Sequence, residues 1–157
     1  MLFRSIEGTL FFSERASLEE WISKLAWLQS RNEDSEVNRY GYFKSKDLTA
    51  NLKMPDAGNF SHLLDYLAEM DYCKTLGMGI VPLSISDIND WAVLTNIRLN
   101  TFELLSITQL SRLYVYKYNE FDRTNASDPT GMFYPENKDK VSYSIKNALR
   151  SMKVDYG

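Results

Sequence analysis

The sequence has 157 residues, of which 44% are hydrophobic, 13% aromatic and 25% charged, and its formal net charge is −3 at pH 7. This balance is typical of a folded domain and excludes a largely disordered chain, while the acidic charge argues against nucleic-acid binding. The single cysteine, Cys73, excludes an internal disulfide and a multi-thiolate metal site, which favours a reducing compartment.

No apolar stretch approaches the length that spans a bilayer, and Glu7 interrupts the N-terminus before the core of a signal peptide could form. We therefore expect a protein that is neither secreted nor embedded in a membrane. A chain of this length can bury one hydrophobic core without help from a disulfide or a metal ion, so residues 1–157 are predicted to form a single domain.

Residues 1–30 are predicted to form a hairpin followed by a helix. Apolar residues alternate on both sides of Glu7-Gly8, which predicts a short β-hairpin between Leu2 and Phe12. Ser17 and Glu20 have the spacing of a capping box, and apolar residues at helical intervals follow them. This pattern predicts a helix that begins at Ser17.

Residues 31–58 lack a clear period and are predicted to be an irregular connector or an interaction arm. A polar run opens this segment, and Pro55 and Gly58 close it. A strand around residues 40–43 is the alternative for its middle. Because aromatic side chains held in loops are favoured interface anchors, we predict partner contacts at Tyr40, Tyr42 and Phe43.

Residues 59–121 are predicted to form the helical core. One helix follows Asn59, and Gly77-Met78-Gly79 is interpreted as its exit, since the lysine of a phosphate-binding loop is absent. A second helix is capped by Ser84 or Ser86 and ends at Asn96. Its inner face is predicted to hold Ile88, Trp91, Ala92 and Leu94-Thr95.

A third helix of this core begins at a capping box formed by Asn100 and Glu103. The helical pair that it completes could be mistaken for a DNA-reading helix-turn-helix. Such a motif places cationic and amide side chains at the start of its second helix, where this chain has an acid and bulky apolar groups. Nucleic-acid recognition by this pair is therefore disfavoured.

Residues 122–157 are predicted to form a loop and a C-terminal helix. The carboxylates of Asp122 and Asp128 are not in the register of a calcium loop, which favours a solvated loop. Beyond it, Phe133 and Tyr134 precede a proline and are predicted as further partner contacts. The fold class is thus mainly α: a small helical bundle with an N-terminal β-hairpin and a long irregular connector.

No catalytic residue, metal ligand or cofactor site is predicted. His62 is the only histidine and has no nearby histidine or cysteine partner, so a structural or solvent-facing role is expected. A carboxylate-only enzyme remains the enzymatic alternative, and it requires paired acids in a concave pocket.

One set of residues between positions 60 and 118 carries a resemblance to a known family. These residues are Pro82-Leu83, Ile88, Trp91, Leu94-Thr95, Ile97, Leu99, Phe102-Glu103, Leu110-Ser111 and Tyr114. Their spacing resembles a recurrent pattern in small proteins of tailed-bacteriophage morphogenesis operons. The chain departs from that pattern at Phe102, where tryptophan is usual, and at Ser111, where aspartate is frequent.

The resemblance implies a non-enzymatic protein of phage assembly, either a tail assembly chaperone or a minor virion component. It implies docking onto other phage structural or assembly proteins, with homo-oligomers as a further expectation, and a location in the virion or the host cytoplasm. The alternative is a phage regulator or host-directed inhibitor that binds a protein or a nucleic acid.

Overall fold

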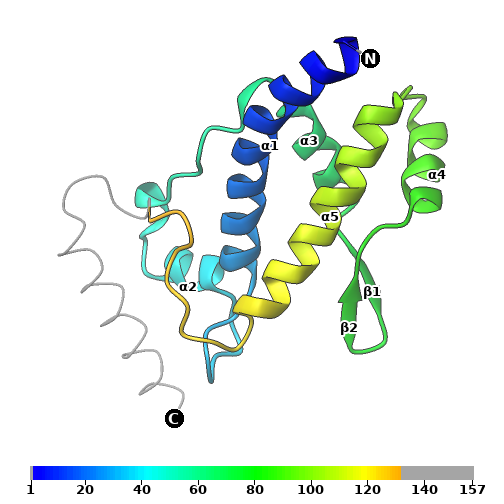
Figure 1. Cartoon of the computed structure of the whole chain (residues 1–157). Coiled ribbons are helices and arrows are strands. Elements are labelled where there is room, and N and C mark those ends of the chain that lie inside the picture. Colours follow the sequence, from blue (N-terminus) through cyan, green and yellow to red (C-terminus); the bar gives the residue numbers. More distant parts are fainter. Residues whose placement is uncertain (1, 132–157) are drawn as a thin grey trace. The chain divides into compact units, whose positions relative to one another are not determined.

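The computed structural model describes the backbone of residues 2–131 and the side chains of residues 15–131 apart from residue 51. This part of the chain is mainly helical and has one small antiparallel sheet (Figure 1). The elements in order are α1 (Leu2–Gln29), α2 (Arg39–Ser45), η1 (Thr49–Asn51), η2 (Gly58–Phe60), α3 (His62–Glu69), β1 (Lys74–Leu76), β2 (Gly79–Val81), α4 (Ile85–Thr95) and α5 (Thr101–Phe121).

The chain divides into two compact units, although the sequence indicates one domain. Unit 1 contains residues 1–22 and 56–116, and unit 2 contains residues 23–55 and 117–157. Both boundaries fall inside helices, after Ile22 in α1 and after Tyr116 in α5. Each unit therefore combines chain segments that are far apart in the sequence.

The core of unit 1 is made by helices that the apolar spacing predicts. Helix α3 buries Leu63, Leu64 and Leu67, which recur at the i, i+1 and i+4 positions of one helical face. The remaining buried hydrophobic residues of this unit are Leu18, Ile22, Leu83, Ile88, Ala92, Ile107, Leu110, Tyr114 and Val115. Burying side chains of this size contributes ~1.5–3 kcal/mol each, which is why the apolar faces determine the packing.

The antiparallel sheet is a hairpin in unit 1, where Thr75 pairs with Ile80 and Leu76 with Gly79. The prediction that Gly77-Met78-Gly79 forms a helix exit is therefore wrong. Helix α3 already ends at Glu69, and Gly77 has a φ of 61° as the first residue of a two-residue hairpin loop. Glycine is favoured at this position because tight hairpin turns require positive φ there.

The predicted N-terminal hairpin is not confirmed, because residues 2–12 form the first part of α1. The physical reason is that Phe3, Ile6 and Leu10 satisfy a helical period as well as an alternating one. Gly8 costs only about 1 kcal/mol inside a helix. The capping box predicted at Ser17 consequently lies within α1 and does not begin it.

Unit 2 contains the predicted connector, and this segment is partly helical. Its helix α2 begins after Asn38, whose side-chain oxygen accepts a hydrogen bond of 2.7 Å from the amide of Gly41. The alternative of a strand around residues 40–43 is therefore wrong. The core of unit 2 consists of Trp27, Leu28, Tyr42, Phe43 and Phe121.

Among residues 2–131, no helix combines the length and the apolar character needed to cross a membrane.

Candidate functional site

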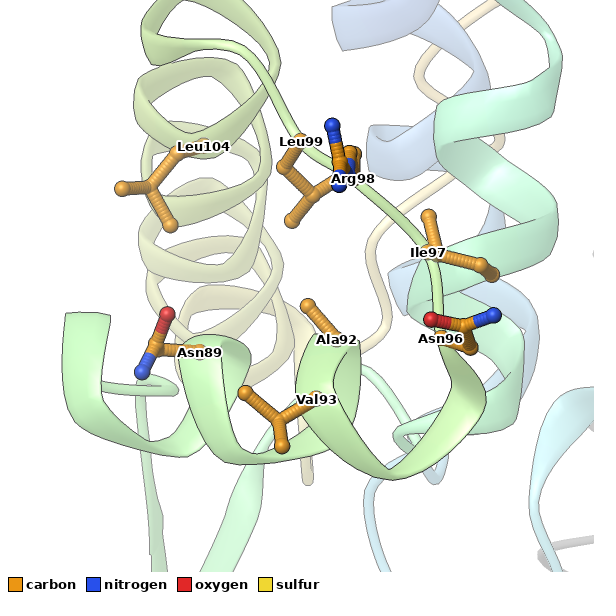
Figure 2. Close-up of a pocket in the computed structure, with 8 residues that line it drawn as sticks. All are labelled: Asn89, Ala92, Val93, Asn96, Ile97, Arg98, Leu99 and Leu104. Carbon is orange, nitrogen blue, oxygen red and sulfur yellow. The ribbon is translucent and has the colours of Figure 1, made fainter.

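An open pocket of about 470 Å³ lies in unit 1, beside the second half of α4 and the first turn of α5 (Figure 2). The side chains of Ala92, Leu99 and Leu104 enter it from α4, from the linker and from α5. The full lining is Asn89, Ala92, Val93, Asn96, Ile97, Arg98, Leu99 and Leu104. This volume lies within the usual range of ligand pockets, ~300–1,000 Å³.

Two helix caps create the pocket by setting the path of a short linker. Asn96 ends α4 in the left-handed conformation with a φ of 57°, and the amide of Ile97 donates to the carbonyl of Ala92 at 3.0 Å. Asn100 then begins α5, because its side chain accepts a 2.8 Å hydrogen bond from the amide of Glu103. The chain between the caps therefore crosses from one helix to the next over only a few residues.

The lining is chemically suited to binding and not to catalysis. Five of its eight side chains are aliphatic, and the polar ones are two asparagines and Arg98. It contains no carboxylate, histidine, cysteine or hydroxyl group that could act as a base or a nucleophile. Mostly apolar walls with a few polar groups are typical of binding pockets.

Most of the large exposed apolar side chains of the described residues belong to unit 1, and some of them lie at this pocket. Val93 is 71% exposed and Leu94 is 86% exposed, both in the second half of α4. Leu94 was predicted on the inner face of this helix, and that prediction is wrong because Ile88 and Ala92 define the buried face. Seven of the nine large exposed hydrophobics among the described residues belong to unit 1.

His62 contacts α5 at the cap of that helix. Its Nε2 lies 3.0 Å from Oε2 of Glu103, and the other carboxylate oxygen of Glu103 accepts from the amide of Asn100 at 3.2 Å. The ring of His62 is also 5.6 Å from that of Tyr66. These contacts link α3 to α5, so His62 forms a structural bridge between the two helices.

No group of three or more histidine, cysteine, aspartate or glutamate side chains that could hold a metal ion exists within the described part of the chain. Cys73 is partly buried, and burial raises the pKa of its thiol. The thiol is therefore less reactive than an ordinary surface cysteine.

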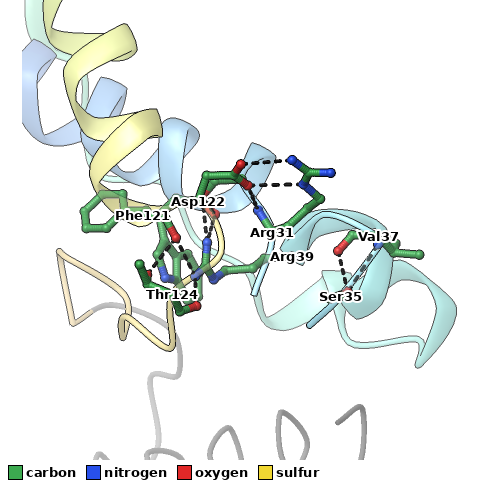
Figure 3. Close-up of polar contacts among 9 residues, drawn as sticks. Arg31, Ser35, Val37, Arg39, Phe121, Asp122 and Thr124 are labelled. Atoms are coloured by element: carbon green, nitrogen blue, oxygen red, sulfur yellow. Dashed lines mark hydrogen bonds and ion pairs between the residues drawn. The ribbon is translucent and has the colours of Figure 1, made fainter. Parts of the chain in front are cut away.

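Unit 2 contains a buried polar cluster that the sequence analysis did not predict (Figure 3). Arg39 is fully buried, and its two terminal nitrogens donate to the carbonyls of Trp27, Phe121 and Thr124 at 3.1, 3.1 and 2.7 Å. These carbonyls lie at or just beyond the C-terminal ends of α1 and α5, where a cation is favourable. Burial lowers the pKa of Arg39 to about 10, which leaves the guanidinium protonated at neutral pH.

The loop after α5 is predicted to be solvated, but the structure shows that two of its acidic side chains form ion pairs. Asp122 accepts from the guanidinium of Arg31 at 3.0 and 3.2 Å, and Asp128 lies 3.1 Å from the ammonium group of Lys24. Burial alone would raise the pKa of Asp122, but the hydrogen bonds from Arg31 outweigh it, so the pKa is lowered. Both acids are therefore structural ion-pair partners.

The predicted partner-binding residues differ in their exposure to solvent. Tyr42 and Phe43 are buried in the core of unit 2 at 6% and 0% exposure, so their assignment as anchors is wrong. Their positions in α2 turn both rings inward. Tyr40 is 45% exposed and keeps its predicted accessibility. Phe133 and Tyr134 lie outside the described residues.

Sequence reasoning missed the pocket. Its local signals were present, since Asn96 and Asn100 end one helix and begin the next within a few residues. The exposure of Val93 and Leu94 had no local signal, because apolar residues in a helix ordinarily indicate its buried face.

No protein-family model matches the chain, and neither the curated proteins nor the solved structures include a significant match to it.

Proposed function

We propose that this chain is a non-enzymatic docking protein that binds an apolar segment of another polypeptide through the α4–α5 pocket. The observation that carries the proposal is the adjacency of that pocket to the exposed Val93 and Leu94. Apolar side chains beside a concave surface are favourable contacts for a partner because their burial removes apolar area from water.

The more specific proposal is a role in phage virion assembly, with a tail or other structural protein as partner. The residues that resemble the phage morphogenesis pattern include Ile88, Trp91, Leu94, Phe102 and Glu103, and they lie in the same two helices that border the pocket. Because Leu94 is exposed, packing within the fold does not account for it, which is consistent with a binding role.

The test is a pair of substitutions on the exposed side of α4. The double variant Val93→Asp, Leu94→Asp should lower affinity for the partner by about tenfold or more, since each lost apolar contact is worth ~1.5–3 kcal/mol when fully buried. Both side chains are exposed, so the thermal unfolding of the variant should match that of the wild type.

The measurement is recovery of the tagged chain from its native host, with mass spectrometry of the bound proteins and of purified particles. Val37→Asp is the matched control, because Val37 is an exposed hydrophobic of unit 2 and is not among the predicted partner contacts. Recovery of a tail or head protein by wild type and control, but not by the double variant, is the expected result. Capture of a host protein alone would favour the regulator, and the absence of any phage component would contradict an assembly role.

A further inference from the structure

Helices α3 and α4 share a surface on which aromatic rings and carboxylates lie together. The indole nitrogen of Trp91 in α4 donates to Oε2 of Glu69, the last residue of α3, at 3.2 Å. The ring of Tyr66 lies 5.1 Å from that of Trp91, and the two planes are tilted by 51°. We refer to Asp65, Tyr66, Glu69 and Trp91 together as the acidic aromatic face.

The two carboxylates of this face have no basic partner among the described residues. Asp65 and Glu69 are exposed, and neither forms an ion pair within that part of the chain. They lie one helical turn apart, a spacing at which like charges repel each other. Glu69 also lies at the C-terminal end of α3, where a carboxylate is unfavourable. A cation bound beside them would relieve both effects.

The surrounding segment adds to the negative potential of the face. Residues 56–116, the part of unit 1 that contains both helices, hold seven aspartates and glutamates against three lysines and arginines. Lys74, the cation nearest to Glu69 in the sequence, is already paired with Asp87. A positively charged ligand is therefore attracted to this segment, and an anion is repelled.

The aromatic rings determine which cation fits the face best. Tyr66 and Trp91 are only partly buried, so each leaves part of its ring open to solvent. A guanidinium is planar, stacks on aromatic rings and binds carboxylates through parallel N–H groups, whereas an ammonium is a compact and strongly hydrated charge. Rings beside carboxylates therefore match arginine better than lysine.

We propose that the acidic aromatic face binds arginine side chains of a basic segment in another polypeptide. The guanidinium stacks against the partly open rings and donates to the carboxylates of Asp65 and Glu69. Because the indole of Trp91 holds Oε2 of Glu69, this carboxylate is already positioned beside the ring before the ligand arrives. None of the four residues of the face lines the α4–α5 pocket, so the inference does not depend on the proposed function of that pocket.

The test is a titration of the isotope-labelled full chain with a short glycine peptide that carries a pair of arginines, followed by NMR. The indole N–H signal of Trp91 reports on the face directly, and its loss in Trp91→Phe assigns it. The arginine peptide should shift this signal and saturate it at roughly millimolar concentration, as expected for one small contact. The same peptide with lysines should bind about threefold more weakly, and one with neutral citrullines should not bind.

Two matched pairs of substitutions separate a local site from the overall charge. Asp65→Asn with Glu69→Gln removes both carboxylates of the face, and the new amide oxygen can still accept from the indole of Trp91. This variant should bind the arginine peptide about fivefold more weakly or worse, since both charged contacts are lost. Glu36→Gln with Asp47→Asn removes the same charge from exposed positions of unit 2 and should bind like wild type.

Thermal unfolding of the carboxylate variant is the second measurement. Because the repulsion between Asp65 and Glu69 is removed, its stability should equal or exceed that of wild type. Glu69→Gln alone is the milder variant, which should weaken binding if the double substitution impairs folding. A Trp91 signal that does not respond to the arginine peptide, or equal weakening by both pairs of substitutions, would overturn the inference. Equal affinities for the arginine and lysine peptides would overturn the assignment of arginine as the ligand.

Discussion

The side chains of Lys24 and Asp128 form an ion pair in unit 2 that is almost fully removed from solvent, at 0% and 4% exposure. A lysine in a helix and an aspartate in a turn-rich segment are both ordinarily solvated residues, and no local pattern distinguishes this pair. A second oxygen of Asp128 accepts from the amide and the hydroxyl of Thr130, which fixes the carboxylate. The pair exists because the loop after α5 returns to α1.

Removal of one charge from this pair should be costly. Asp128→Asn keeps an acceptor for Thr130 but leaves the ammonium of Lys24 buried without a counter-ion, so the free energy of unfolding should fall by about 3–5 kcal/mol. Urea denaturation measures this change. The double variant Lys24→Met, Asp128→Asn should recover most of the loss because no charge remains unpaired. Equal stability of single and double variants would show that the pair is not desolvated in solution.

The ion pair between Arg31 and Asp122 predicts a dependence of stability on pH. Because the pKa of Asp122 is lowered in the folded state, the unfolded chain takes up this proton first as pH falls. The stability that the pair contributes is therefore complete above the unfolded value of about 4 and is lost as the pH falls below it. The free energy of unfolding measured between about pH 5 and pH 2 should decrease less steeply in Asp122→Asn. An unchanged slope would exclude Asp122 as a contributor.

At the scale of single elements, the N-terminal cap of helix α4 shows what neighbouring residues in the sequence can predict. The sequence left Ser84 and Ser86 as alternative caps, and the structure selects Ser84, whose hydroxyl accepts from the amide of Asp87 at 3.1 Å. The carboxylate of Asp87 accepts from the amide of Ser84 at 2.9 Å and completes the capping box. These hydrogen bonds lower the pKa of Asp87, chiefly through the backbone amide of Ser84.

Loss of this cap should destabilise the protein modestly. Ser84→Ala should reduce the free energy of unfolding by about 1 kcal/mol, because the amide of Asp87 loses its partner at the helix end. Ser86→Ala is the matched control, since Ser86 is an exposed serine of the same turn without a capping role. Thermal unfolding of both variants measures the difference. A larger loss in Ser86→Ala than in Ser84→Ala would contradict the observed cap.

Other elements were not predictable from the same kind of signal. The N-terminal stretch fits two periods, and a short apolar run cannot distinguish between them without its packing partners. Helix α2 is only seven residues long and would be marginal in isolation. Its stability comes from the burial of Tyr42 and Phe43, which no local pattern reveals.

At the scale of the molecule, both units are assembled from distant segments. In unit 2, the indole nitrogen of Trp27 donates to the carbonyl of Ala126 at 2.8 Å, and Arg39 reaches the carbonyl of Thr124 at 2.7 Å. In unit 1, Ser111 connects the two ends of the hairpin to α5. Such contacts select which of the polar and aromatic residues become buried.

The amino-acid order alone was sufficient for the presence of α3, for α4 and α5, and for the caps at Asn96 and Asn100, because these features depend on groups within about four residues of one another. It was not sufficient for the end of α3 or for the hairpin that follows it. Burial is different, since it requires a second surface that the chain supplies only after it has folded. For that reason, the core position of Phe43, the ion pair at Asp128 and the pocket bordered by exposed Val93 became apparent only in three dimensions.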